Sequence, residues 1–356
     1  MKPHLPLNKI LHGDALDVLR RLPAGLVHTC VTSPPYWGLR DYGVPQQIGL
    51  EETPAEYVIK LVRVFHEIRR VLRPDGTLWL NLGDSYAGSG RGLNADGTPS
   101  DRTQAKQGTN RGSLLDLSNR LVAPGATGRA WVAPAAGLKP KDLVGIPWRV
   151  AFALQDDGWW LRCDIIWQKP NCMPESVSDR PTRSHEYLFL LSKRRQYYYD
   201  GDAILEPYAP SSDVRYWQAL RAGRSYAVKP PYRTNTPYAG AYKRGQGRVQ
   251  SRGNHADGLV VGGARDGRNR RSVWTVPTHP YRGAHFATFP ERLVEPCIRA
   301  GAPPGGIVLD PFLGSGTTAV VAQRLKRNYI GIELNLEYIR LARLRLEDRD
   351  AHGRFA

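Results

Sequence analysis

The order of apolar and polar residues along the first half of the chain predicts strands that alternate with helices. Two short runs of strand-forming residues, at 7–12 and 27–32, flank a segment that begins with Gly-Asp and ends at a proline, which is typical of a short helix. From Pro54 onward, apolar residues recur at helical spacing until the Pro-Asp-Gly at 74–76, where we expect the helix to end. A strand over TLWLNLGD should follow it.

The second half continues the alternation and places a βαβ unit at the C-terminal end. A helix at about 142–156 precedes two largely apolar strands, GWWLRCDIIW and EYLFLLSK. After a further helix at about 290–300, the chain from Gly305 reads as strand, glycine-rich turn, helix, strand and helix. Such a unit leaves an exposed parallel edge, so the strands near the N-terminus must complete the same α/β sheet and the two termini should lie close together.

Two segments lack this periodicity. Residues 86–137 are rich in Gly, Ser, Asn and Arg, and we expect them to form a long mobile basic loop. Residues 201–275 are also basic and irregular, and we interpret them as an inserted recognition region. The remaining segments, 1–85, 138–200 and 276–356, are expected to build one domain.

Charge is concentrated in these two irregular segments. The 356 residues include 50 Lys and Arg against 33 Asp and Glu, a net charge of +17, which indicates a polyanionic partner. Residues 207–283 hold fourteen Lys or Arg and three Asp, and residues 86–140 hold seven against three, so together they supply 15 of the 17 excess charges. A solvated surface would also explain an excess of charge. The nine Tyr and Trp within 207–283 favour phosphate contacts and base stacking instead.

Several classes of protein are disfavoured by the sequence. No run of eighteen apolar residues occurs, and the N-terminal MKPHLPLNKI lacks the apolar core of a secretory signal, so we expect a cytoplasmic protein without a membrane partner. The four cysteines form no CxxC pair, which argues against a disulfide framework and against a thiolate zinc site. We assign no metal site.

A glycine-rich turn, LDPFLGSGTT, offers the first candidate site. Gly314 and Gly316 lie between a strand that ends at Asp310 and a helix that starts near Thr317, so the backbone can approach a ligand closely. A phosphate-binding P-loop would require a lysine where Thr317 stands. The turn therefore favours a different ligand.

The residue at the end of the next strand narrows the choice of ligand. Glu333 comes seventeen residues after Gly316, where an acidic side chain can accept hydrogen bonds from both ribose hydroxyls of a nucleoside. The apolar Phe312 could cover such a cofactor where a pyrophosphate would need bare amides. S-adenosylmethionine, a nucleoside without phosphates, fits this pattern better than NAD.

The second candidate site is the turn VTSPPYW, which follows an expected buried strand. Pro34 and Pro35 have no N–H, and Ser33 adds a hydroxyl that can accept, so the turn is rich in hydrogen-bond acceptors. Two acceptors aimed at the hydrogens of an exocyclic amino group would favour a pyramidal nitrogen with its lone pair free. Tyr36 would stack on a base flipped out of the duplex. A surface turn with its aromatics in the core is the alternative interpretation.

TSPPYW at 32–37, together with DPFLGSGTT at 310–318 and IELN at 332–335, is similar to the amino-methyltransferases of DNA. Because the catalytic motif precedes the cofactor motif, the order resembles their beta type. The resemblance implies a Rossmann-like methyltransferase sheet with circularly permuted motif order, S-adenosylmethionine as cofactor and double-stranded DNA as partner. Residues 1–85 would then hold the catalytic half, residues 138–200 would continue the methyltransferase domain, and residues 276–356 would hold the cofactor-binding half.

The resemblance also assigns roles to individual positions. Phe312, Gly314 and Gly316 would line the cofactor, Glu333 would hold its ribose, and Asp14 would reach its adenine. Phe286 and Thr288, in HFATFP, would lie against the methionine end. The expected catalytic residues are Ser33, Pro34, Pro35 and Tyr36, and the expected cofactor-binding residues are Asp310, Phe312, Gly314, Gly316, Thr317, Glu333, Phe286, Thr288 and Asp14.

The methylated base follows from one position. Family members that methylate adenine N6 mostly carry Asp, sometimes Asn, where this chain has Ser33, and a serine is usual among cytosine-N4 enzymes. We therefore expect cytosine N4, with adenine N6 as runner-up and an RNA amino group as a distant third. A ring-carbon methyltransferase would need a cysteine nucleophile, and we interpret Cys297, in an expected helix, as core.

A protein that binds DNA without catalysis is the alternative from a different class. It would be a basic DNA-binding module that keeps the fold only as a scaffold. A cognate restriction endonuclease is a candidate partner, while the sequence indicates no oligomeric state. His185 and Glu186 begin an expected buried strand near the base pocket, and we assign them no role.

Overall fold

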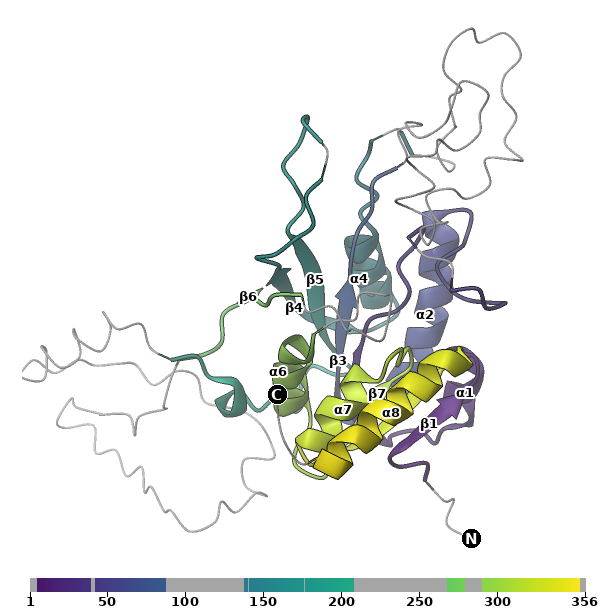
Figure 1. Cartoon of the computed structure of the whole chain (residues 1–356), viewed down its shortest axis with the longest axis vertical. Helices are drawn as coiled ribbons and strands as arrows, with labels where there is room; N and C mark the ends of the chain where they lie inside the picture. Colours follow the sequence, from purple (N-terminus) through teal and green to yellow (C-terminus); the bar gives the residue numbers. More distant parts are fainter. Residues whose placement is uncertain are drawn as a thin grey trace, which may run out of the picture.

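The computed structural model describes residues 5–39, 42–87, 138–139, 141–175, 177–207, 268–278 and 290–352. Within them one sheet runs in the order β1-β8-β7-β2-β3-β5-β4-β6 (Figure 1). Its strands are β1 (Lys9–His12), β2 (Val27–Thr32), β3 (Leu72–Leu82), β4 (Trp160–Gln168), β5 (His185–Ser192), β6 (Val273–Thr275), β7 (Ile307–Asp310) and β8 (Asn328–Glu333). The helices are α1 (Ala15–Arg21), α2 (Pro54–Val71), α4 (Ile146–Asp156), the short 3-10 helix η2 (Asp202–Ile204), α6 (Glu291–Gly301), α7 (Thr317–Arg324) and α8 (Leu336–His352).

The sheet joins the two ends of the chain, as predicted. β1 pairs in parallel with β8, with Leu11 opposite Ile332, and β7 lies between β8 and β2. β5 is antiparallel to both of its neighbours, β3 and β4. The N-terminal strands therefore complete the sheet that the C-terminal βαβ unit begins, and the expected α/β fold with permuted order is confirmed.

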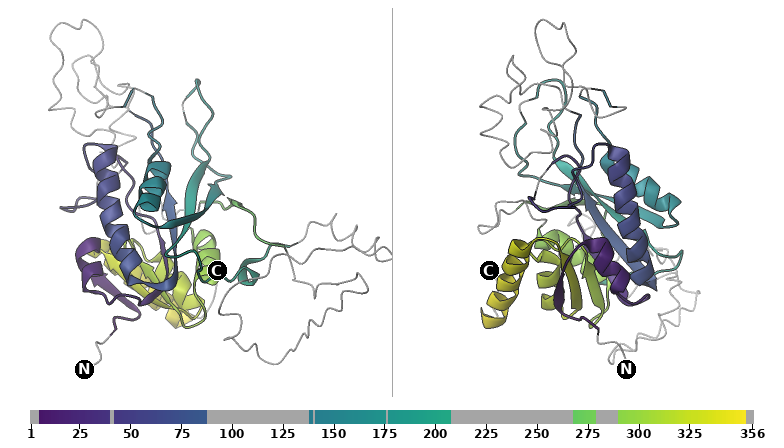
Figure 2. Two further views of the ribbon diagram at one scale, coloured as in Figure 1. Left: turned by 180° about the vertical axis from the view of Figure 1, so that it is seen from behind. Right: turned by 90° about the vertical axis from the view of Figure 1, so that its right-hand side faces the viewer.

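Helices cover both faces of the sheet (Figure 2). Neighbouring strand residues point to opposite faces, so that Leu78 and Leu80 pack with α1, α2 and α4, while Trp79 between them packs with α6, α7 and α8. All three side chains are at most 1% exposed. This two-sided burial explains why the strands read as nearly continuous apolar runs. No helix in the described ranges combines the length and the apolar character that a membrane span requires.

The local sequence determines where α2 begins, and the helix leads directly into β3. Thr53 and Glu56 form a reciprocal capping box at its N-terminus, with Pro54 in the first turn. The helix ends at Val71, and β3 begins at once, so the Pro-Asp-Gly that we expected to end the helix lies within β3. The ladder skips these residues, because β2 pairs with Leu72 and then with Thr77.

Two further features differ from the sequence prediction. α4 begins at Ile146 rather than near residue 142. β6 was expected to be irregular, but its three residues pair with β4, and Trp274 is buried against Trp79. Apart from such edges, the predicted loop at 86–137 and the predicted recognition region at 201–275 lie outside the described residues, so both stay predictions.

Candidate active site

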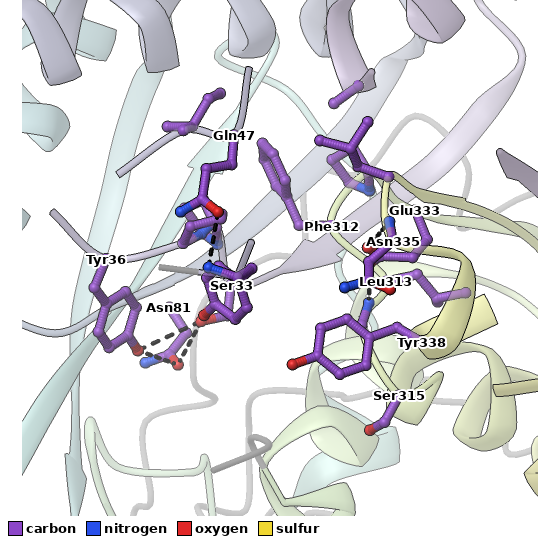
Figure 3. Close-up of a pocket in the computed structure, with 18 of the residues that line it drawn as sticks. Ser33, Tyr36, Gln47, Asn81, Phe312, Leu313, Ser315, Glu333, Asn335 and Tyr338 are labelled. Atoms are coloured by element: carbon purple, nitrogen blue, oxygen red, sulfur yellow. Dashed lines mark hydrogen bonds between the residues drawn. The ribbon is translucent and has the colours of Figure 1, made fainter. Parts of the chain in front are cut away.

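A cavity of about 400 Å³ opens at the carboxyl ends of the parallel strands β1, β2, β7 and β8. Ligands of open α/β sheets bind at this end, because the loops that leave the strands converge there. Figure 3 shows Ser33, Asn81 and Tyr36 grouped on one side, Glu333, Asn335 and Tyr338 on the other, and Phe312 between the groups. The two motifs that the sequence singled out therefore face a common space.

A buried carboxylate holds these two motifs together. Asp310 Oδ1 accepts a hydrogen bond of 2.6 Å from the Thr32 hydroxyl, and Oδ2 accepts one of 2.6 Å from the Thr318 hydroxyl. The backbone N–H of Phe312 donates to the same carboxylate at 3.1 Å. Burial raises the pKa of Asp310 to about 6, although these three donors oppose the shift. Asp310 is not among the residues that line the cavity, so it positions the turns around it, and its expected contact with a cofactor stays a prediction.

On the cofactor side, Glu333 is fixed by backbone donors. Its Oε2 accepts from the N–H of Gly314 at 2.7 Å, and its Oε1 accepts from the N–H of Asn335 at 2.8 Å. Burial raises the pKa of Glu333, and these N–H groups counteract part of that rise. Each carboxylate oxygen keeps a lone pair for a further donor. The arrangement fits a ligand that offers two neighbouring hydroxyls.

The two glycines of the turn have different roles. Gly314 has φ +53° and lines the cavity, where it lets the backbone come close to a ligand. Gly316 has φ +87° and does not line it. A Cβ at Gly316 would lie 2.8 Å from Cβ of Ala342 in α8, so this glycine allows close helix packing, and its contact with a cofactor stays a prediction.

The other predicted cofactor residues divide into two groups. Asp14, Phe312 and Thr317 line the cavity, and the Asp14 side chain also caps α1 by accepting from the N–H of Asp17 at 3.1 Å. Phe286 and Thr288 lie outside the described residues, so their contact with the methionine end stays a prediction.

On the opposite side, the catalytic turn meets residues of β3 and β5. The Tyr36 hydroxyl lies 2.6 Å from Glu186 Oε2 and 3.0 Å from Asn81 Oδ1. Ser33 Oγ lies 3.2 Å from the same Asn81 oxygen and 3.4 Å from the Tyr36 oxygen. Burial first, and then the charge of Glu186, raise the pKa of Tyr36, so its hydroxyl remains a donor.

The orientation of the Asn81 amide determines which way these hydroxyl protons point. Its Nδ2 donates to the carbonyl of Tyr187 at 3.1 Å and to Glu186 Oε2 at 3.1 Å, so its Oδ1 faces the turn. Tyr36 has a single proton, for which Glu186 is the nearest acceptor. Asn81 Oδ1 is then left to accept from Ser33, and the lone pairs of Ser33 Oγ are free for a donor in the cavity.

The two prolines of the turn are not equivalent. The hydroxyl of the buried Tyr57 donates to the carbonyl of Pro35 at 2.8 Å. The carbonyl of Pro35 therefore already has a protein donor, which the sequence did not indicate. Ser33 Oγ and the carbonyl of Pro34 remain as the acceptors of the turn for a ligand, and both residues line the cavity.

Among the cavity residues that had no role in the sequence prediction are Asn81, Lys169 and Glu186. Each is a polar residue at the end of an apolar strand, which is the signal that could have indicated them. Asn81 is fully buried in β3, and Glu186 stands one residue into β5. Their proximity depends on β3, β5 and β4 being neighbours, which the sequence does not reveal.

Comparison with known proteins gives a consistent family. The family model described as DNA methylase matches residues 27–344. The chain is 45% identical to type II methyltransferase M.Cfr9I of Citrobacter freundii, over 96% of this chain and 89% of that protein. It is 45% identical to type II methyltransferase M.SmaI of Serratia marcescens, over 95% of this chain and 90% of that protein.

Solved structures share the fold at lower sequence identity. PvuII DNA methyltransferase, described as cytosine-N4-specific, matches with a TM-score of 0.56 and 18% identity, covering 95% of this chain and 85% of that one. A protein of Thermus thermophilus, described as a DNA modification methylase complexed with S-adenosyl-L-methionine, matches with a TM-score of 0.51 and 21% identity. That match covers 97% of this chain and 96% of the other. At these identities the likeness shows the fold.

Proposed function

The chain belongs to the N6/N4 family of DNA methylases, and on this premise we propose that it is a type II DNA methyltransferase that methylates the exocyclic N4 of a flipped-out cytosine. S-adenosylmethionine is the expected cofactor. Its two ribose hydroxyls suit the Glu333 carboxylate, and because it carries no phosphate, the apolar Phe312 side chain can cover it. When bound, it supplies an electrophilic methyl group on a sulfonium. Double-stranded DNA is the proposed partner.

The observation that carries this proposal is the state of Ser33. Because Asn81 accepts the Ser33 proton, Ser33 Oγ offers only lone pairs to the cavity, beside the carbonyl of Pro34. These acceptors suit the two hydrogens of an amino group. Held in this way, the nitrogen becomes pyramidal and its lone pair is free to attack, which stabilises the transition state more than the ground state.

The choice of cytosine is supported by the neutral character of this acceptor. Ser33 occupies the position where adenine-specific members mostly carry a carboxylate, and its proton is satisfied by a neutral amide, Asn81. Adenine N6 presents the same two hydrogens and is the alternative that the experiment below separates.

The role in a cell follows from the relatives. Since proteins at 45% identity are named type II methyltransferases, we propose a cognate restriction endonuclease as a partner of the system. The basic segments at 86–137 and 201–275 would bind phosphates and read base edges.

Mass spectrometry of nucleosides tests the proposal directly. DNA from cells that express the protein is compared with DNA from cells that express Ser33→Ala, and Ser178→Ala, at an exposed position outside both basic segments, serves as the control. We expect N4-methylcytosine with the intact protein and the control and a severe loss with Ser33→Ala. N6-methyladenine in its place would overturn the base assignment, and the absence of both products would support the binding-module alternative.

A further inference from the structure

An ion pair lines the cavity beside the catalytic turn, and the methyl transfer described above does not use it. Lys169 follows β4, Glu186 lies in β5, and the Lys169 ammonium contacts Glu186 Oε1. The two side chains are 19% and 15% exposed, and both residues line the cavity. Because desolvating two charges is costly, a pair at such a site calls for a functional explanation.

The Lys169 ammonium is held in a defined place. The backbone N–H of Lys169 donates to the carbonyl of Ser184 at 2.8 Å, which closes the β4–β5 hairpin at this residue. The ammonium lies 4.4 Å from the centroid of the Trp167 ring and contacts Glu186 on another side. An ammonium has three N–H donors, so these two contacts leave one for a ligand in the cavity.

Glu186 connects this donor to the residues that face the amino group. The same carboxylate accepts from the Tyr36 hydroxyl at 2.6 Å and from Asn81 Nδ2 at 3.1 Å. The cavity wall therefore presents the acceptors of Ser33 and Pro34 first, and then the Lys169 ammonium, with the Glu186 carboxylate between them. The Watson–Crick edge of cytosine has the complementary order: an amino donor, then the acceptors N3 and O2.

Resting on the proposed function, we propose that Lys169 is a specificity-determining residue that donates to the acceptor edge of the flipped cytosine, with Glu186 as the residue that positions its ammonium. Adenine offers N1 beside its amino group and then a C–H, which cannot accept. A fixed cation on this side of the cavity therefore favours cytosine over adenine. A hydrogen bond from a charged donor corresponds to a rate or affinity effect of about 10- to 150-fold.

The test pairs a protein substitution with a substitution in the base. The single-turnover rate of methyl transfer is measured for the wild type and Lys169→Met on a duplex that carries the recognised sequence. The target is cytosine, 3-deazacytosine, which replaces N3 by C–H, or 2-thiocytosine, which replaces O2 by a weak acceptor. Lys141→Met is the matched control, because Lys141 also pairs with a carboxylate, that of Asp179, but at an exposed position.

We expect Lys169→Met to slow methylation of cytosine by about 10- to 150-fold, and 2-thiocytosine, which alters the acceptor that adenine lacks, to slow the wild type similarly. That analogue should then cause little further loss in Lys169→Met, because the hydrogen bond is already absent. Lys141→Met should behave like the wild type. If the rate losses caused by Lys169→Met and by the analogue instead multiply, Lys169 acts independently of the base edge. That outcome, or an unchanged rate in Lys169→Met, would overturn the proposal.

Two provisions keep the outcome clear. Lys169→Met leaves the Glu186 carboxylate without its cation, so Lys169→Met/Glu186→Gln is measured as a second variant, and cofactor binding by calorimetry verifies that each variant is folded. The methylated nucleoside made by the wild type is identified first. N6-methyladenine at that stage would refute the proposed function, whereas N4-methylcytosine with independent analogue losses would refute only the role of Lys169.

Discussion

At the scale of single residues, Asp310 shows how one buried group can organise a site without lining its cavity. It is 1% exposed and joins the end of β2 to the start of α7 through Thr32 and Thr318. Burial raises its pKa to about 6, above the ordinary value of 3.8, so the folded protein binds a proton more tightly than the unfolded chain does. Stability contributed by that proton is complete below the unfolded pKa and is lost as the pH rises through about 6.

Asp310→Asn should therefore change how stability depends on pH. Between about pH 4.5 and pH 7, the free energy of unfolding of the wild type should fall by about 2 kcal/mol relative to that of the variant. Urea unfolding at several pH values measures this difference. Asp179→Asn is the control of opposite sign, because Lys141 lowers the pKa of the exposed Asp179. A constant difference between Asp310→Asn and the wild type would show that this carboxyl titrates normally.

What the sequence could predict at this scale depended on neighbours along the chain. Ser33 and Glu333 were expected at the site because Ser33 directly follows a strand and Glu333 ends one, and the structure places both on the cavity. Asn81 and Glu186 could not be assigned, because their contact arises from the pairing of β3 with β5. The donor to the carbonyl of Pro35 was likewise not predictable, because Tyr57 reaches it from α2, which is distant from the turn along the chain.

At the scale of elements, the permuted sheet was predictable from connectivity. A C-terminal βαβ unit needs further strands beside it, and the strands expected near the N-terminus could supply them. β6 was missed because three residues in a basic stretch carry too little alternation to be recognised. Its place at the edge of the sheet is set by pairing with β4 and by burial of Trp274.

Gly83, directly after β3, leaves room for the Tyr36 ring of the catalytic turn because it has no side chain. A Cβ at Gly83 would lie 2.5 Å from Cε2 of Tyr36, a contact that must displace the ring. Gly83→Ala should therefore slow methyl transfer by at least about tenfold, since small misplacements at a reacting centre are costly, and leave cofactor affinity nearly unchanged. Rapid-quench kinetics and calorimetry measure the two effects separately.

Glu333→Ala is the matched contrast to that variant. Because Glu333 lies on the cofactor side, its loss should weaken cofactor binding, with a smaller effect on the rate at saturating cofactor. If Gly83→Ala instead weakened cofactor binding as much as Glu333→Ala does, the separation of the cavity into two sides would be wrong.

At the scale of the whole molecule, the fold brings together motifs that are far apart in the sequence. Thr32 and Asp310 are 278 positions apart, yet they are in direct contact because β2 lies next to β7. The cavity opens at the carboxyl ends of the strands, whereas Lys9 and Lys326 lie near the opposite ends of β1 and β8. Most of the excess positive charge lies in neither place but in the two basic segments.

This distribution predicts how DNA binding depends on salt. If residues 207–283 contact phosphates, removing three of their cations should release fewer counterions on binding. The variant is Arg221→Gln, Arg224→Gln and Arg233→Gln. The slope of log affinity against log salt concentration, measured by fluorescence anisotropy, should become shallower by about 3, because each phosphate that is no longer neutralised accounts for about 0.9.

The matched control removes the same charge from the far end of the sheet, with Lys9→Gln, Lys326→Gln and Arg343→Gln, all at exposed positions. Its slope should stay within about one of the wild type, because counterion release depends on the phosphates that are neutralised rather than on net charge. Equal changes in the two variants would mean that the affinity reflects the overall charge of the protein. In that case the basic segment would act as a solvated surface, and recognition of the DNA would have to come from elsewhere in the chain.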